Sequence, residues 1–186
     1  MILYVNACVR NESRTRRLAE KLIDKLESVN KEEIKEVRLE NISMPIADEE
    51  FINKRDSLAR SGRFDDPMFD LARDFAGADT IVIAAPYWDL SFPAMLKQYI
   101  EQINVVGLTF KYLDNGMPMG LCKAGRLYYV TTAGGPIVSD EYGFGYVRTI
   151  AEVFYGIKDI HYIKAEGLDI VGADVEAILK AVPVTI

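Results

Sequence analysis

The amino-acid sequence predicts an α/β fold in which a five-stranded parallel sheet carries helices on both faces. Five short apolar segments alternate with amphipathic or charged segments, a pattern typical of parallel strands joined by right-handed helical crossovers. Residues 80–85, TIVIAA, are apolar throughout, as a central strand buried on both faces should be. Because the composition does not change along the 186 residues, we expect a single domain over residues 1–186.

The first half of the chain predicts two strands and three helical segments. A helix is expected where leucine, isoleucine and valine recur at helical spacing with charges on the opposite side. A charged stretch with a turn signal near Gly62 predicts two helical pieces with a break between them. In order, the expected elements are a strand at 2–7, a helix at 15–29, a more exposed strand at 34–40 and two helical pieces within 48–76.

The second half continues the alternation. Pro93 is expected in the first turn of a helix, where its missing N–H does no harm. Residues 105–125 are expected to be a loop, because turn dipeptides occur at Asn115-Gly116 and Met117-Pro118. The other expected elements are strands at 80–85, 126–132 and 160–165 and helices at 93–104, 145–157 and 173–182.

Charge and composition narrow the classes of function. The formal net charge is −6, and no block of five lysines and arginines is present, which argues against nucleic acid or an anionic membrane as a partner. The N-terminal apolar run is too short for a signal peptide or a membrane span. Cys8 and Cys122 lie far apart, as in a cytoplasmic chain with reduced thiols. His161 is the only histidine, so neither a metal site nor a Ser-His-Asp triad is expected.

The loop after the first strand is a candidate phosphate site. Ligands of open parallel sheets bind beyond the carboxyl ends of the strands, and this loop brings Arg10, Ser13, Arg14 and Thr15 to the start of a helix. It lacks both the P-loop and the dinucleotide fingerprint. A plain N-cap with solvated arginines is the alternative. Arginine near a helix start opposes the dipole and becomes favourable once an anion arrives, which favours phosphate.

The loop after the third strand is a candidate site for a flat ring. Tyr87 and Trp88 follow the strand directly and would form an apolar wall, unless they are only a lid over the core. Asp89 adds acceptors, and the backbone around it adds donors. This mixture suits a heteroaromatic ring with an N–C=O edge.

The loop at 131–145 is the third candidate. Gly134 and Gly135 permit positive φ and close backbone approach, and their N–H groups would meet carbonyl oxygens or developing negative charge; a flexible turn is the alternative. Together the three loops predict one ligand with a phosphate, a planar ring and ring oxygens. Flavin mononucleotide (FMN) fits this description.

Several segments of the chain carry a family resemblance. They are SRT (13–15), APYWDLSFPAMLKQYIEQI (85–103), GLTFKYLDNG (107–116) and TTAGGP (131–136). On these segments the chain resembles the flavodoxin-like NAD(P)H:quinone reductase superfamily and looks most similar to bacterial FMN-dependent NADH-azoreductases. The similarity runs nearly end to end.

This resemblance implies a fold, an assembly and an activity. The fold would be flavodoxin-like with strand order 2-1-3-4-5, and the protein a homodimer with two FMN sites at the subunit interface. The activity would be ping-pong, two-electron transfer from NADH or NADPH to quinones or azo compounds, with hydride passing through flavin N5. The alternative that we keep is a flavodoxin-type electron-transfer protein without a small-molecule substrate.

The family's cofactor-binding positions can be carried over residue by residue. Ser13, Arg14 and Thr15 match phosphate-contacting positions, and Arg10 lies in the same loop. The segment along the flavin ring corresponds to Pro86, Tyr87, Trp88, Asp89 and Leu90, and the loop at the pyrimidine edge to Thr132, Ala133, Gly134 and Gly135. The chain departs from the family where arginine replaces a hydroxyl or amide in the 10–15 loop and where Asp89-Leu90 replaces an Asn-aromatic pair.

Three further residues are candidates for catalysis and substrate binding. Tyr142 is the nearest candidate to hydrogen-bond near flavin N1 or O2, although it would equally suit a mobile loop. Phe110 and Tyr112 either roof the substrate site, from this subunit or its partner, or pack at the dimer interface.

Overall fold

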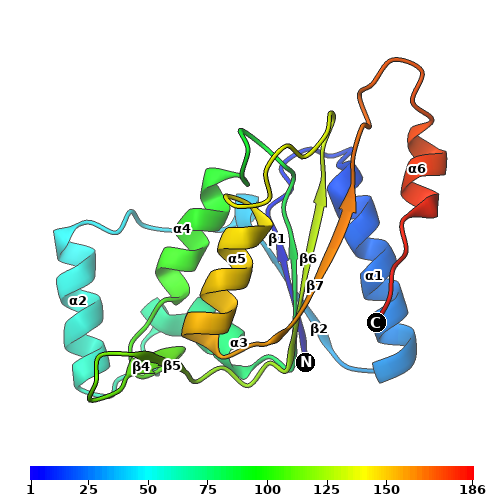
Figure 1. The fold of residues 1–186 in the computed structure, drawn as a ribbon. Coiled ribbons are helices and arrows are strands. Elements are labelled where there is room, and N and C mark those ends of the chain that lie inside the picture. The colour runs from blue at the N-terminus through cyan, green and yellow to red at the C-terminus, as the bar shows by residue number, and fades with distance from the viewer.

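A five-stranded parallel sheet forms the centre of the molecule (Figure 1). The structure is a computed structural model that describes residues 1–186 apart from the side chain of Asn30. The strands of this sheet are β1 (Ile2–Asn6), β2 (Ile34–Arg38), β3 (Thr80–Ala84), β6 (Arg126–Thr132) and β7 (Asp159–Ala165). Their spatial order is β2-β1-β3-β6-β7, and every neighbouring pair is parallel. The predicted order 2-1-3-4-5 is confirmed.

Helices cover both faces of this sheet, as predicted. Helices α1 and α6 lie on one face, and α3, α4 and α5 lie on the other (Figure 1). The α-helices are α1 (Arg14–Asn30), α2 (Glu49–Arg60), α3 (Asp70–Gly77), α4 (Ala94–Ile103), α5 (Phe144–Ile150) and α6 (Val175–Ala181), and short 3₁₀ turns occupy Leu39–Asn41 and Pro67–Phe69. Within the described residues, no helix combines the length and the apolar character needed to cross a membrane.

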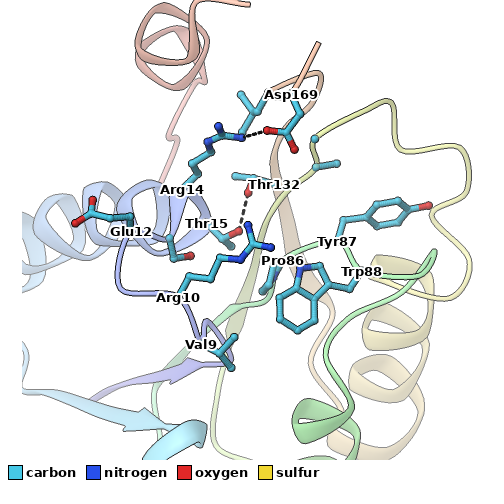
Figure 2. A pocket seen from close by; sticks show the side chains of 14 residues that line it. Val9, Arg10, Glu12, Arg14, Thr15, Pro86, Tyr87, Trp88, Thr132 and Asp169 are labelled. Carbon is cyan, nitrogen blue, oxygen red and sulfur yellow. Dashed lines mark hydrogen bonds and ion pairs between the residues drawn. The ribbon is translucent and has the colours of Figure 1, made fainter. Parts of the chain in front are cut away.

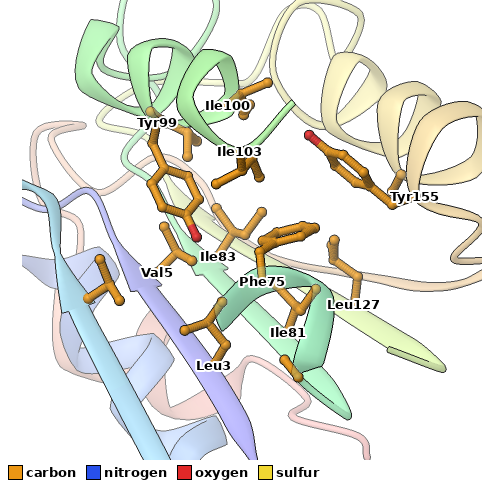
Figure 3. Close-up of a cluster of buried hydrophobic side chains, with 14 of the residues drawn as sticks. Leu3, Val5, Phe75, Ile81, Ile83, Tyr99, Ile100, Ile103, Leu127 and Tyr155 are labelled. Carbon is orange, nitrogen blue, oxygen red and sulfur yellow. The ribbon is translucent and has the colours of Figure 1, made fainter. Parts of the chain in front are cut away.

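The apolar strands supply both cores. Along β1, Leu3 and Val5 pack into the cluster under α3, α4 and α5, whereas Ile2 and Tyr4 pack into the cluster under α1 and α6. This alternation explains why the central strands are continuously apolar. Figure 3 shows the first cluster, in which the rings of Phe75 and Tyr155 meet edge to face with centroids 4.7 Å apart.

The prediction of a loop at 105–125 is wrong, because this segment contains an antiparallel hairpin. Strands β4 (Phe110–Tyr112) and β5 (Pro118–Gly120) pair around a turn in which Gly116 has a φ of +81°. The hairpin lies at the amino end of the main strands, away from their carboxyl ends (Figure 1). A Cβ on Gly120 would lie 2.2 Å from the backbone of Tyr155, so tertiary packing holds these very short strands.

Two expected helices differ in detail. The helix expected at 145–157 is α5 followed by a π-helical turn over Ala151–Tyr155, which ends at Gly156 with a φ of +76°. The helix expected at 93–104 begins one residue later, so Pro93 is the N-cap and not part of the first turn. Neither difference moves the loops at the carboxyl edge of the sheet.

Candidate functional site

A crevice of about 360 Å³ opens at the carboxyl edge of the sheet (Figure 2). The loops after β1, β3, β6 and β7 line it, and its volume falls in the usual range of small-ligand sites. It lies where the strand order reverses beside β1, the position at which open α/β sheets bind ligands. All predicted cofactor-binding residues except Asp89, Leu90 and Gly135 line this crevice.

The first wall is the start of α1. Ser13 is the N-cap, and its side chain accepts from the backbone N–H of Arg16 at 3.2 Å, as the N-cap alternative expects. The N–H groups of Arg14 and Thr15 belong to the first turn and have no acceptor within the helix. The first turn of α1 contains no acidic residue, so the positive end of its dipole is available to an anion.

Arg16 shapes this loop, and the sequence interpretation missed it. Only 9% of Arg16 is exposed, and its guanidinium donates to the carbonyl oxygens of Arg10 and Asn11, the latter at 3.0 Å. A buried arginine that satisfies loop carbonyls fixes the path of the backbone between β1 and α1. The sequence offers only a run of three arginines within residues 14–17, which does not distinguish this role.

A buried pair of hydroxyls joins the first and third loops. The Oγ1 atoms of Thr15 and Thr132 lie 2.7 Å apart, and both residues are buried. This contact brings the start of α1 against the end of β6. The predicted phosphate-contacting and ring-edge positions therefore border one cavity.

The second loop supplies the aromatic wall. The backbone N–H of Tyr87 donates to the Thr132 carbonyl at 3.0 Å, and its phenol donates to the Ser139 carbonyl at 3.2 Å. The phenol thus reaches the third loop. Trp88 lines the crevice beside Pro86 and remains 36% exposed (Figure 2). This exposure favours the wall over the alternative of a lid on the core.

Asp89 and Leu90 form the tip of the second loop. Their φ angles are +51° and +66°, a left-handed conformation uncommon for residues other than glycine. They form a two-residue turn closed by mutual backbone hydrogen bonds between Trp88 and Ser91 at 3.1 and 2.7 Å. The structure places both side chains in solvent outside the crevice lining, so their contact with a ligand stays a prediction.

The third loop meets the loop after β7. The carbonyl oxygens of Gly134 and Gly135 accept from the backbone N–H groups of Asp169 and Gly167 at 2.8 and 3.1 Å. Neither Gly134 nor Gly135 adopts positive φ, so the turn does not use that freedom. The close approach does occur at Gly134: a Cβ there would lie 2.1 Å from Asp169 Oδ2, so the carboxylate would have to move away.

Asp169 is a second residue that the sequence interpretation missed. Its carboxylate accepts from the Arg14 guanidinium at 2.6 Å across the crevice rim (Figure 2). Ligands of such a sheet bind beyond the carboxyl ends of its strands, and Asp169 lies in the loop after the fifth strand. This general rule was the only signal in the sequence for a role of Asp169.

Three predicted residues do not face the crevice within one chain. Tyr142 is 59% exposed and borders a separate groove between α4 and α5, while its carbonyl accepts from Ser91 Oγ at 2.6 Å. Phe110 is buried against Phe154, with ring centroids 4.7 Å apart. Tyr112 is 55% exposed on the hairpin at the opposite end of the sheet.

Cys8 lies beneath the first loop. Burial raises the pKa of its thiol to about 11, and the thiol donates weakly to the Ala84 carbonyl. The side chain is therefore neutral and packs as a small buried residue.

Fold and crevice together define an open α/β protein with a crevice at its strand-order switch point, bordered by a helix start suited to an anion. A family model described as flavodoxin-like fold matches residues 1–182. The chain is 39% identical over 183 residues to the FMN-dependent NADH:quinone oxidoreductase of Coprothermobacter proteolyticus, covering 94% of this chain and 90% of that protein. It is 38% identical over 187 residues to FMN-dependent NADH:quinone oxidoreductase 2 of Clostridium acetobutylicum, covering 96% and 92%. The chain belongs to the flavodoxin-like family, together with these oxidoreductases.

Solved structures share the fold. An azoreductase from Bacillus anthracis superposes with a TM-score of 0.84 at 24% identity, covering 97% of this chain and 93% of that one. An FMN-dependent NADH-azoreductase from Bacillus anthracis, solved in complex with FMN, gives 0.79 at 23% identity, covering 96% and 92%. The family match and the two oxidoreductases confirm the predicted resemblance to the quinone reductase superfamily, and the azoreductase structures share its fold.

Proposed function

We propose that this protein is an FMN-dependent oxidoreductase that takes electrons from NADH and passes them to quinones, with azo compounds as a second class of acceptor. The names of its relatives support the cofactor, the donor and the acceptor class. The observation that carries the proposal is the convergence of the three predicted loops on one crevice.

The residues present fit FMN. A phosphate would lie at the start of α1, where Ser13, Arg14 and Thr15 gather and no acidic side chain occupies the first turn. The start of α2 contrasts with it, since Glu49 and Glu50 stand in its first turn. The ring system would lie against the exposed indole of Trp88.

Bound FMN supplies the transfer of two electrons between a nicotinamide and an acceptor. The protein's residues bind, orient and shield it. Trp88 and Pro86 keep water from one side of the crevice, and the N–H groups of Gly134 and Gly135 are proposed to stabilise negative charge at the polar ring edge. Tyr142 is the proposed phenol near that edge, on a loop that Ser91 ties to the second loop.

We also propose a homodimer in which the β4–β5 hairpin of one subunit borders the crevice of the other, with Phe110 and Tyr112 near the substrate. Large apolar side chains are exposed on and next to this hairpin, namely Tyr112, Leu113, Met117, Met119 and Leu121. Such a patch is typical of an interaction surface. Light scattering after size exclusion should give twice the chain mass of 20.9 kDa, and a monomer would contradict this assembly.

One spectroscopic experiment tests the activity. The purified protein should show a flavin absorption band that NADH bleaches and a quinone restores, and initial rates should follow ping-pong kinetics. Parallel assays with NADPH and with an azo dye define the donor and acceptor range. A protein that takes up no FMN would contradict the proposal, and one-electron titration without NADH oxidation would favour a flavodoxin-type carrier.

A further inference from the structure

Asp169 occupies the rim of the crevice on the side of the phosphate-binding helix. Its Oδ1 lies 2.6 Å from Nη1 of Arg14, and both side chains line the crevice together with Ser13 and Thr15 (Figure 2). Its side chain is 68% exposed, compared with 37% for that of Arg14. The ion pair with Arg14 is therefore the contact that holds the carboxylate. Once that pair is broken, the exposed side chain can turn into solvent.

The backbone around Asp169 is built to bring a carboxylate to this point. The N–H of Asp169 donates to the Gly134 carbonyl at 2.8 Å. A side chain at position 134 would collide with Asp169 Oδ2 at 2.1 Å. The first turn of α1 contains no acidic residue. Besides Glu12, which precedes the N-cap, Asp169 is the carboxylate that lines the crevice there, and its Oδ1 pairs with Arg14.

We propose that Asp169 is an internal competitor for the phosphate of the cofactor. In the ligand-free protein its carboxylate pairs with Arg14, and an incoming phosphate takes over the guanidinium and displaces the carboxylate. This inference rests on the proposed function, since it requires a phosphate-bearing ligand in the crevice. Asp169 then lowers the affinity for FMN but not for riboflavin, which has no phosphate to place there.

The alternative role is that Asp169 orients Arg14 for the phosphate. The two roles predict opposite effects of Asp169 on the affinity for FMN. Arginine has five donors, so one guanidinium can in principle serve both anions. The exposed carboxylate nevertheless adds negative charge beside an incoming phosphate, and that repulsion disfavours binding. An orienting residue would strengthen FMN binding, whereas a competitor weakens it.

The test is the affinity of Asp169→Asn for FMN and for riboflavin, measured on apoprotein by quenching of flavin fluorescence at low salt. We expect FMN to bind roughly two- to fivefold more tightly, because the ligand no longer breaks an exposed ion pair. Riboflavin affinity should not change. The melting temperature of the apoprotein should fall slightly, since Arg14 loses its charged partner.

Two variants control for indirect effects. Glu176→Gln removes a similar exposed ion pair, in which Glu176 of α6 lies 2.6 Å from Arg17 of α1. Neither residue lines the crevice, so this variant should leave FMN affinity unchanged. In an Arg14→Gln background, Asp169→Asn should give a clearly smaller gain in affinity, because the competition for that guanidinium is gone and only the charge repulsion remains.

The outcomes separate this inference from the proposed function. Unchanged or weaker FMN binding by Asp169→Asn, or an equally large gain without Arg14, overturns the competitor role. If the wild-type protein binds neither flavin, the proposed function fails, and inorganic phosphate then serves as the probe. A larger rise in melting temperature with phosphate in Asp169→Asn than in wild type still supports competition, and an equal or smaller rise overturns it.

Discussion

The two edges of the central sheet use their polar groups differently. At the amino edge, Asp79 accepts from the amino group of Met1 and from Lys123, each at 2.6 Å. Arg126 pairs with Asp159 at 2.5 Å, so strands β6 and β7 begin with a salt bridge. At the carboxyl edge, by contrast, the first turn of α1 presents backbone donors that its own helix cannot satisfy.

This difference teaches where the molecule is stabilised and where it binds. The amino edge also contains Gly120, the glycine at which an added Cβ would come nearest to backbone atoms, those of Tyr155. The carboxyl edge is hollowed into the crevice. Changes at the amino edge outside the β4–β5 hairpin should therefore alter stability and spare ligand affinity, and changes at the carboxyl edge should alter affinity as much as stability.

The largest effect is expected from Gly120→Ala. The new Cβ would meet the carbonyl carbon of Tyr155 at 2.2 Å, and backbone atoms cannot move aside as a side-chain tip can. We expect the free energy of unfolding to fall by about 3 kcal/mol, measured by urea denaturation. Gly125→Ala, where a Cβ meets nothing within 4 Å, is the control, and equal losses in the two variants would contradict the contact.

The next effect concerns the buried hydroxyl pair of the crevice. Thr15→Val leaves Thr132 Oγ1 without its partner at 2.7 Å and should cost about 1–3 kcal/mol of stability. The double variant Thr15→Val/Thr132→Val should recover most of that loss, because no unpaired hydroxyl remains. Both the single and the double variant should bind FMN more weakly than the wild type, because both lack the Thr15 hydroxyl at the proposed phosphate site. Recovered affinity would show that these hydroxyls serve only packing.

A smaller effect distinguishes two helix caps. Ser13 caps α1, and Asp48 caps α2 by accepting from the Phe51 N–H at 2.9 Å. Replacing either by alanine should lower the free energy of unfolding by about 1 kcal/mol. Only Ser13→Ala should weaken FMN binding, by roughly tenfold if its hydroxyl contacts the phosphate. Equal FMN affinities in the two variants would place the phosphate elsewhere.

Most of the fold could be predicted because burial on both faces leaves a direct trace in sequence. Strands such as β3 are continuously apolar, and α1 carries a regular apolar stripe. The hairpin left no such trace. Its strands have three residues each and are held by packing on the turn around Tyr155, which lies far along the chain.

The crevice could be predicted only as far as loop positions and residue types allow. The start of α1 and the aromatic pair at 87–88 could be predicted, since a sheet of this class binds ligands beyond the carboxyl ends of its strands. Arg16 and Asp169 were not, because each acts through contacts that depend on the folded loop or on a residue distant in sequence. For the same reason the sequence could show that Gly134 permits close approach, but not that it makes room for the Asp169 carboxylate.

The smallest effect tests the amino edge by pH. Lys123, and then the amino group of Met1, hold the pKa of Asp79 below its ordinary value. A lowered carboxyl pKa stabilises the folded state above the unfolded pKa, about 3.9, and this contribution is lost as pH falls through the lower folded value. Asp79→Asn should therefore cost about 0.2–1 kcal/mol at pH 7 and close to nothing once the wild-type carboxyl is protonated.

Urea denaturation of both proteins at pH 7 and at successively lower pH measures this difference. Asp24→Asn is the control, because Asp24 is exposed on α1 and the described residues include no ion pair to it. FMN affinity at pH 7 should be the same in all three proteins, since Asp79 lies at the edge away from the crevice. A cost for Asp79→Asn that persists at low pH would mean that the side chain acts through packing, and the charged amino edge would then not be what stabilises that end of the sheet.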